Sequence, residues 1–207
     1  MSFAFDRATH TYTLEGAVLP GVTSVLKAQR LITSPPVADP FYLERGKAAH
    51  EAIRLWLEGD LDESTVDEQV RPYLQSAQAF CELVGFEPIA AEIPLHCSIT
   101  RTAGTPDAIG FSRAGILLPD WKCGPHQPGY AVQVGGAYLS MLRQPRVLDA
   151  LGLSTRDAAG IKPCVVPLSA ALPRPVWIDP QEASRLTTVY RAAVTCYAYR
   201  RAEGMAE

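Results

Sequence analysis

The sequence predicts an α/β fold in which a mixed central β-sheet is flanked by helices, and three observations support this prediction. The apolar periodicity gives the order helix, strand, strand, strand, helix, strand through the middle of the chain. Hydrophobic residues make up 47% and charged residues 20% of the 207 residues, as in an ordinary globular protein. No internal repeat or low-complexity segment competes with this pattern. We therefore expect a single domain over residues 1–207, with an N-terminal hairpin and a C-terminal helix.

The first part of the chain is expected to form a hairpin and a short helix. Residues 11–19 contain two short apolar runs around the dipeptide Glu-Gly, which suits a tight turn. Thr23 or Ser24 can then cap a helix that continues to about Arg30. A hydroxyl at this helix start could also contact a phosphate, but capping is the commoner role. A loop is expected around residues 34–36.

Two longer helices and a strand follow. The first helix spans about residues 41–58, and His50 falls on its apolar stripe together with Leu43 and Ile53. The second helix spans about residues 66–84, with a proline tolerated in its first turns. A strand is expected over residues 89–96. Within it Glu92 either has an outer role at a metal site or lies exposed, because a buried carboxylate needs a cationic partner.

A second hairpin brings two aspartates and a lysine onto neighbouring strands. Two apolar runs, residues 105–111 and 115–121, are separated by turn residues. Side chains alternate along a strand, so Asp120 and Lys122 share one face. Asp107 begins its strand where Asp120 ends the partner strand, so an antiparallel hairpin sets the two carboxylates side by side.

This arrangement of charges predicts a metal site. Two carboxylates at close range repel each other unless a cation lies between them, and hard oxygen ligands favour Mg²⁺ or Mn²⁺. The lysine can then orient or deprotonate a water near a metal-bound phosphate. The D-x-K pattern alone is weak, since it arises by chance in many chains.

The rest of the chain completes the α/β pattern. After a polar loop that contains His126, which we expect to be exposed to solvent, a helix is expected over about residues 130–142. Residues 145–160 read as irregular with one short helix, and residues 165–168 and 176–178 as strands. Asp179 and Pro180 open a final helix over residues 181–201.

The order of these motifs resembles the PD-(D/E)xK nuclease superfamily, in particular its RecB-like and phage exonuclease branch. Residues 105–107 (TPD) and 120–122 (DWK) are similar to the signature of the superfamily. The branch carries Gly-x-x-x-His on an earlier helix, which Gly46 and His50 match. The ordered set His, Asp, D-x-K and Gln is much more specific than D-x-K alone. The resemblance covers roughly residues 46–138.

A later helix of the branch carries a Gln with aromatic neighbours, which Tyr130 and Gln133 resemble. The branch normally has a Tyr four residues after this Gln. Here Ala137 holds that place and Tyr138 follows it. This difference from the pattern of the branch affects the role expected for Tyr138 but not the match of Gln133.

The resemblance implies a restriction-endonuclease-like αβββαβ core and a divalent-metal-dependent DNase that hydrolyses phosphodiester bonds. It assigns catalysis to Lys122, Asp120, Asp107 and Glu92, and one or two Mg²⁺ or Mn²⁺ ions to His50, Asp107, Asp120 and the carbonyl of Trp121. The residues expected to contact DNA are Gln133, Tyr130, Tyr138, Arg101 and Lys47. The expected activity is that of an exonuclease on duplex ends or single strands, in recombination, repair or phage DNA processing, with a recombination protein as a partner.

The net charge of the chain leaves functions other than a DNA exonuclease open. Lys plus Arg number 19 and Asp plus Glu 22, so the net charge of −3 gives no global basic field for nucleic acid. A catalytically weak or inactive nuclease-fold module that binds DNA or a protein is therefore an alternative, as is a structure-specific endonuclease. A nucleoside or nucleotide hydrolase is a third alternative, but the sequence has no glycine-rich phosphate loop.

The cysteines and the N-terminus bear on cofactors and location. The five cysteines are Cys81, Cys97, Cys123, Cys164 and Cys196, and no C-x-x-C pair occurs. A zinc site and an iron–sulfur cluster are therefore not expected, and free buried thiols in a reducing compartment are. The first residues lack an apolar signal segment, and no run is long enough to span a membrane. We expect a cytoplasmic protein with no membrane partner.

Overall fold

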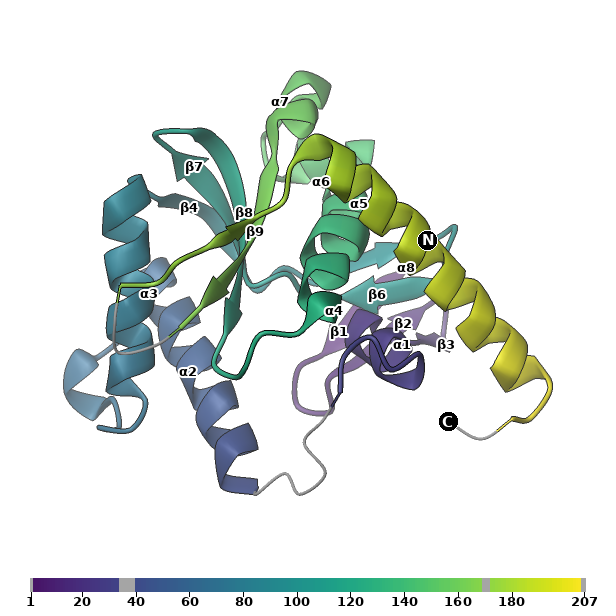
Figure 1. Cartoon of the computed structure of the whole chain (residues 1–207), viewed down its shortest axis with the longest axis horizontal. Coiled ribbons are helices and arrows are strands. Elements are labelled where there is room, and N and C mark those ends of the chain that lie inside the picture. The colour runs from purple at the N-terminus through teal and green to yellow at the C-terminus, as the bar shows by residue number, and fades with distance from the viewer. Residues whose placement is uncertain (1, 34–39, 169–171, 206–207) are drawn as a thin grey trace.

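The computed structural model describes residues 2–33, 40–168 and 172–205. Its centre is a five-stranded mixed sheet flanked by helices, as the sequence predicts (Figure 1). In spatial order the strands are β10 (Val176–Trp177), β9 (Lys162–Pro167), β8 (Gly115–Lys122), β7 (Ala108–Ser112) and β4 (Glu87–Ala91). Strands β8 and β9 are parallel, and the other neighbours are antiparallel. The expected hairpin is therefore confirmed as β7 and β8.

The alternation of side chains along β8 divides the core into two layers. Leu117 and Trp121 pack on one face, against α2 (Pro40–Glu58) and α3 (Arg71–Val84). Ile116 and Leu118 pack on the other face. There they meet the helical run α4 (Pro128–Ala131), η2 (Val132–Tyr138) and α5 (Leu139–Leu142), together with α1 (Val22–Ala28) and α8 (Pro180–Ala202). Asp120 therefore belongs to the second face.

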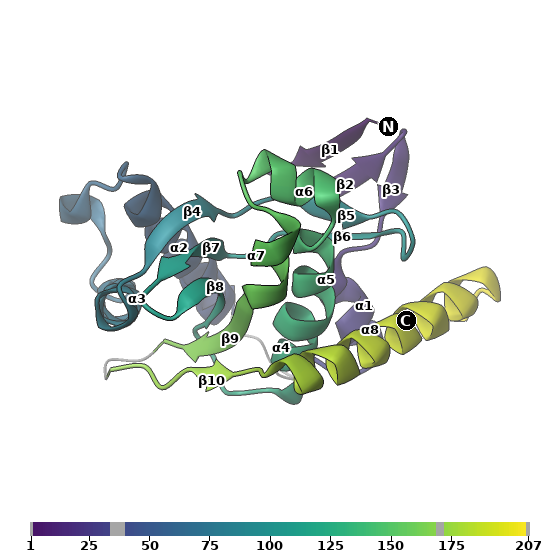
Figure 2. The same ribbon diagram turned by 90° about the horizontal axis from the view of Figure 1, so that it is seen from above.

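Two small sheets lie beside this core (Figure 2). The expected N-terminal hairpin is present as β2 (Thr11–Leu14) and β3 (Ala17–Leu19), and β1 (Phe3–Asp6) adds a strand that we did not expect. Strands β5 (Leu95–Cys97) and β6 (Thr102–Gly104) form a second hairpin, also not expected. A parallel bridge between Gly21 and Ala103 joins the two sheets. The remaining helical elements are η1 (Glu63–Thr65), α6 (Pro145–Ala150) and α7 (Thr155–Gly160).

Several expected element ends were wrong. Helix α1 begins at Val22 with Gly21 at its N-cap and no side-chain cap, so neither Thr23 nor Ser24 caps it. Helix α3 begins at Arg71 rather than near residue 66, next to Pro72, which cannot donate to a preceding turn. Residues 145–160 form two short helices rather than one. The loop expected at residues 34–36 lies outside the described residues.

The strand expected over residues 89–96 is broken. Strand β4 ends at Ala91, and Glu92 has a φ of 45°, in the left-handed region that a strand cannot accommodate. The Glu92 N–H is satisfied by the carbonyl of Asp107, at 2.9 Å. Glu92 is therefore held at the end of β4 by the residue that precedes β7.

The long helices agree better with expectation. Helix α2 spans the expected residues, although Leu43 is 53% exposed and does not belong to its buried face. Helix α8 begins as expected, with the Asp179 side chain accepting from the Glu182 N–H. Within the described ranges, no helix is both long enough and apolar enough to cross a membrane.

Candidate metal centre

The open end of the β7–β8 hairpin positions Asp107 against β8. The ladder pairs Gly110 with Leu117, and beyond this pair the two strands separate. In the gap, Asp107 Oδ2 accepts a hydrogen bond from the backbone N–H of Trp121 at 2.7 Å. Leu168 N–H donates to the Lys122 carbonyl on the β9 side, so by alternation the N–H and C=O of Trp121 face the opposite side, toward Asp107.

Asp120 and Lys122 share one face of β8, as alternation requires. Asp120 is buried, and its Oδ2 lies 2.6 Å from Lys122 Nζ. The lysine ammonium also lies 4.9 Å from the centroid of the Tyr130 ring, an arrangement that favours its charge. Trp121 points to the other face and packs edge-on against Phe80. The ion pair is thus fixed by strand geometry and by an aromatic ring from α4.

His50 reaches the same end of the hairpin from α2. Its Nδ1 lies 3.2 Å from Asp107 Oδ1. The two oxygens of Asp107 therefore connect the helix and β8, one on His50 and the other on the Trp121 N–H. The side chain of Cys123 also contributes to raising the pKa of His50, an influence that we did not predict.

Glu92 completes a group that could hold a metal ion. One ligand atom from each of His50, Glu92 and Asp107 lies within 4.8 Å of the others. The three residues come from α2, from the residue after β4 and from the residue before β7. An imidazole nitrogen with carboxylate oxygens suits Mn²⁺ well and Mg²⁺ less well.

Electrostatics in this group follow from burial and from the shared negative charge. Burial raises the pKa of Asp120 to about 6; the charge of Lys122 opposes this rise, and repulsion from Asp107 adds to it. Burial and the charge of Asp107 likewise raise the pKa of Glu92. Both carboxyls are therefore harder to ionise than usual, which is the condition that a bound cation relieves.

The basic partners are correspondingly stabilised in their charged forms. Burial lowers the pKa of His50, but the charge and hydrogen bond of Asp107 outweigh it and raise that pKa to about 10. Burial also lowers the pKa of Lys122, and Asp120 and Asp107 together reverse this and raise it. Burial raises the pKa of Asp107, and the charges of His50 and Lys122 hold it below its usual value. Lys122 is thus protonated at neutral pH.

The side chain of Asp120 also presents a buried oxygen to the site. Asp120 Oδ1 is buried, and no side chain or backbone group of the described residues donates a hydrogen bond to it. A buried carboxylate oxygen without a donor is costly unless a cation satisfies it. The donor set of this site therefore fits a divalent ion that prefers oxygen and imidazole ligands.

Gln133 and Tyr138 meet next to this site. The Gln133 side-chain N–H donates to the Tyr138 hydroxyl at 2.9 Å, and a second contact joins it to Thr23 Oγ1 at 3.3 Å. Tyr138 lies five residues after Gln133, a spacing at which side chains diverge on a regular α-helix. They face each other because η2 is π-helical. The ring of Tyr138 packs over Gly104, where a Cβ would lie only 2.6 Å from a ring carbon.

The other three residues predicted to contact DNA, Tyr130, Lys47 and Arg101, lie in different surroundings. Tyr130 covers Lys122, and its hydroxyl accepts from the Gln127 side chain at 3.2 Å. Lys47 is exposed one turn before His50 and forms an ion pair with Glu44 at 2.8 Å. Arg101 is exposed in the turn before β6, whereas Asp107 follows that strand, so the structure does not bring Arg101 to the metal ligands.

A polar cavity of about 230 Å³ adjoins the site on the side of the N-terminal sheet. Gly104, Thr105 and Tyr138 form one wall, and Tyr12 forms another. The Tyr12 hydroxyl lies 2.8 Å from Thr105 Oγ1, across 93 residues of sequence. No local pattern could have identified Tyr12, because its partner is set by the packing of β2 on the segment before Asp107.

Comparison with known proteins adds little to this geometry. No protein-family model matches the chain, and no curated protein matches it. Among solved structures, it is similar to the crystal structure of a protein from Eubacterium rectale named "Putative exonuclease", with 8% identity and a TM-score of 0.47. The match covers 89% of this chain and 74% of that one.

Proposed function

We propose that this chain is a divalent-metal-dependent DNase with a site built like that of RecB-like and phage PD-(D/E)xK nucleases. One observation carries the proposal. Asp107 contacts His50 with one oxygen and accepts from the Trp121 N–H with the other, and Trp121 stands between Asp120 and Lys122. A histidine, two aspartates and a lysine from distant segments thus converge at one end of the central hairpin.

The metal ligands follow from the same geometry. His50, Glu92 and Asp107 would hold Mn²⁺ or Mg²⁺, and Asp120 Oδ1, which is outside that group of three, would be a further oxygen ligand together with the Trp121 carbonyl. A divalent ion bound there would activate a water and neutralise charge on the phosphate. Because imidazole is a better ligand for manganese, we expect higher activity with Mn²⁺ than with Mg²⁺.

Lys122 has the role of a positioning cation. Its raised pKa keeps the ammonium protonated, so it is suited to orienting a water or balancing phosphate charge rather than to accepting a proton. The Asp120 carboxylate and the Tyr130 ring restrict where the ammonium can lie. This preorganisation supports a charge-stabilising role in phosphodiester hydrolysis.

Residues around the metal ligands would contact the DNA. Tyr130 lies on the helical run that covers the Asp120 face of the sheet and is partly exposed, so it can contact the nucleotides next to the scissile phosphate, whereas the buried Gln133 and Tyr138 would support that wall of the site from beneath. Lys47 would contact the backbone from α2. Arg101 is better placed to contact DNA beyond the site than at it.

The proposal is tested by incubating the purified protein with linear and circular duplex DNA and with single-stranded DNA. Each substrate is combined with Mn²⁺, Mg²⁺ or chelator. Loss of linear DNA alone indicates an exonuclease, and nicking of circles indicates an endonuclease. The variants Asp120→Asn and Lys122→Ala should each lower cleavage to background while retaining a folded circular-dichroism spectrum. Cleavage in chelator, or by both variants at the wild-type rate, would contradict the proposal, and DNA binding without cleavage would assign a binding module instead.

A further inference from the structure

A basic cavity of about 340 Å³ lies where the end of α1 meets α8. It is lined by Lys27, Ala28, Gln29, Arg30 and Arg200. Three of these five residues are cations and none is acidic, in a chain whose net charge is −3. Such a local excess of positive charge attracts anionic ligands even when the whole protein is acidic.

Helix packing and backbone hydrogen bonds fix the residues that line this cavity. Helix α1 packs against α8, as both ribbon views show (Figures 1 and 2). Arg200 Nη1 donates to the carbonyl of Ala28 at 3.1 Å and so fixes the end of α8 on the last turn of α1. Arg30 has a φ of 56°, an unfavourable conformation for a residue other than glycine, and its N–H donates to the Lys27 carbonyl at 2.9 Å. The turn thus holds the Arg30 side chain at the cavity.

Several side chains that line the cavity carry hydrogen-bond donors. Gln29 Nε2 is buried, and among the described residues nothing accepts a hydrogen bond from it. Lys27 and Arg30 are exposed and add ammonium and guanidinium donors. Ammonium and guanidinium groups are the donors that contact the phosphates of a nucleic-acid strand.

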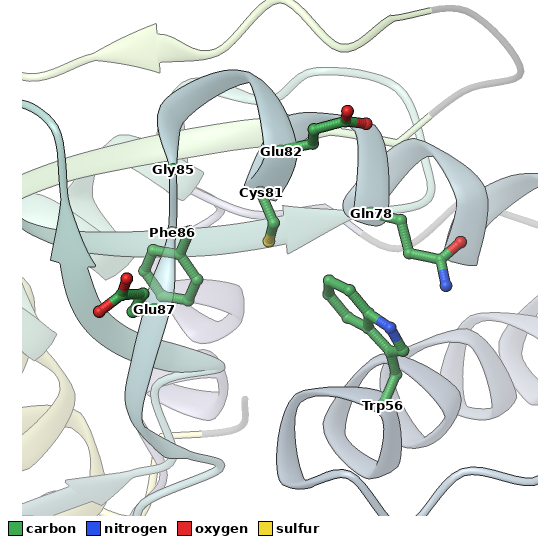
Figure 3. A pocket seen from close by; sticks show the side chains of 7 residues that line it. All are labelled: Trp56, Gln78, Cys81, Glu82, Gly85, Phe86 and Glu87. Carbon is green, nitrogen blue, oxygen red and sulfur yellow. The ribbon is translucent and has the colours of Figure 1, made fainter.

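A second cavity provides a contrast. It measures about 450 Å³ and lies between α2, α3 and the start of β4, lined in part by Trp56, Phe86, Glu82 and Glu87 (Figure 3). Its two carboxylates would repel a phosphate. It also lies at the end of β4 opposite Glu92. Cavity size alone therefore does not identify the surface that a polyanion would use.

Helix α1 connects the basic cavity to the metal centre. At its start, Thr23 contacts Gln133, which lies beside Tyr138. At its end are Lys27 and Arg30. The seven residues of α1, Val22–Ala28, correspond to about 10 Å of helix, or about three nucleotides along a duplex axis. A strand that leaves the metal centre along α1 would therefore place a backbone phosphate at the basic cavity.

We infer that the cavity lined by Lys27, Gln29, Arg30 and Arg200 is an exosite for the DNA backbone, separate from the metal ligands. The inference rests on the proposed function for the identity of the polymer. Its role is affinity, because a phosphate held away from the reacting bond adds binding energy without touching the reacting atoms.

The test uses the full chain with two charges removed, Lys27→Gln together with Arg30→Asn. Asparagine tolerates the left-handed conformation at position 30, so the fold should persist. The matched control is Arg156→Gln together with Arg174→Gln, which removes two exposed charges elsewhere. Binding of a fluorescent duplex is measured by anisotropy in chelator, at several salt concentrations.

The exosite variant should bind DNA at least tenfold more weakly than wild type. Its plot of log binding constant against log salt concentration should be less steep, with a slope smaller in magnitude by about 1.8, whereas the control variant should keep the wild-type affinity and slope. With Mn²⁺, its KM for DNA should rise while kcat at saturating DNA and hydrolysis of bis(p-nitrophenyl) phosphate stay unchanged. An equal loss of DNA affinity in the exosite and control variants, or no DNA binding by wild type at low salt, would contradict the exosite proposal. Selective loss of binding in a chain that never cuts DNA would retain the exosite and reject the nuclease.

Discussion

The side-chain amide of Gln133 donates to the hydroxyl of Tyr138, five residues later, at 2.9 Å. In a regular α-helix, side chains four residues apart face each other, and those five apart diverge. Residues Val132–Tyr138 form a π-helix, whose wider turn absorbs one additional residue. This wider turn therefore brings Tyr138 to Gln133 although the two are five residues apart. Such π-helical turns are frequent at functional sites.

We first predict that Tyr138→Phe lowers DNA cleavage at least tenfold because the Gln133 amide loses the partner that orients it. Tyr190→Phe is the matched control, since the Tyr190 hydroxyl donates to Thr102 Oγ1 at 2.8 Å in the core. Each variant should lose about 1 kcal/mol of unfolding free energy in urea, the usual cost of one buried hydrogen bond. Equal cleavage rates in the two variants would show that Tyr138 serves only the fold.

The metal ligands give the second prediction. Mn²⁺ at a hundredfold excess over its Kd should stabilise the wild type by about 2.7 kcal/mol, which corresponds to roughly 5–10 °C in Tm for a chain of this size. Glu92→Gln should reduce this shift, because it removes an anionic ligand. Glu87→Gln, at the other end of β4, should keep it. The measurement is a thermal melt with and without Mn²⁺, and an identical shift in both variants would remove Glu92 from the ligand set.

The buried ion pair gives the third prediction. Asp120→Asn and Lys122→Met should each destabilise the metal-free protein, by about 3 kcal/mol, because each leaves a buried group without its partner at 2.6 Å. The double variant should lose less than the sum of the two, by at least 1 kcal/mol. Urea unfolding in chelator measures all four corners of this cycle. Strict additivity would mean that the pair does not interact in solution.

The parts of the site that could be predicted are those governed by local rules. The hairpin that carries Asp120 and Lys122 follows from strand alternation and a short turn, and the structure confirms it. The apolar spacing of α2 likewise placed His50 on the inner side of a helix that the structure confirms. In both cases the determining interactions lie within a few residues.

The parts that could not be predicted depend on distant segments. Glu92 leaves the expected strand because its N–H is bound by the Asp107 carbonyl, fifteen residues later. The π-helix packs against α8 at Gly136, where a Cβ would lie 2.6 Å from the carbonyl oxygen of Leu186. Neither contact leaves a pattern in the local sequence, because each depends on how helices and strands pack after they form.

The last prediction concerns acid stability and His96, which is buried between Phe3 and Arg146. The His96 and Phe3 ring centroids are 4.4 Å apart, and Arg146 Nη2 lies 2.6 Å from His96 Nε2. Arginine can only donate, so the histidine accepts and is neutral. Burial, together with the charge of Arg146, lowers the pKa of His96 in the folded protein. Protonating it would bring two cations into contact.

The sign of the effect follows from this lowered pKa. As pH falls below about 6.5, the unfolded chain binds a proton at His96 before the folded chain does, so stability is lost by up to about 1.4 kcal/mol per pH unit until the folded pKa is reached. Above pH 6.5 both states are neutral at this residue, and the contribution is constant. His96→Phe keeps the ring against Phe3 and removes the titration. Urea unfolding in chelator at pH 7.5, 6.5 and 5.5 should therefore show a shallower loss of stability in the variant. Parallel pH profiles for the two proteins would mean that His96 is protonated equally in the folded and unfolded chains.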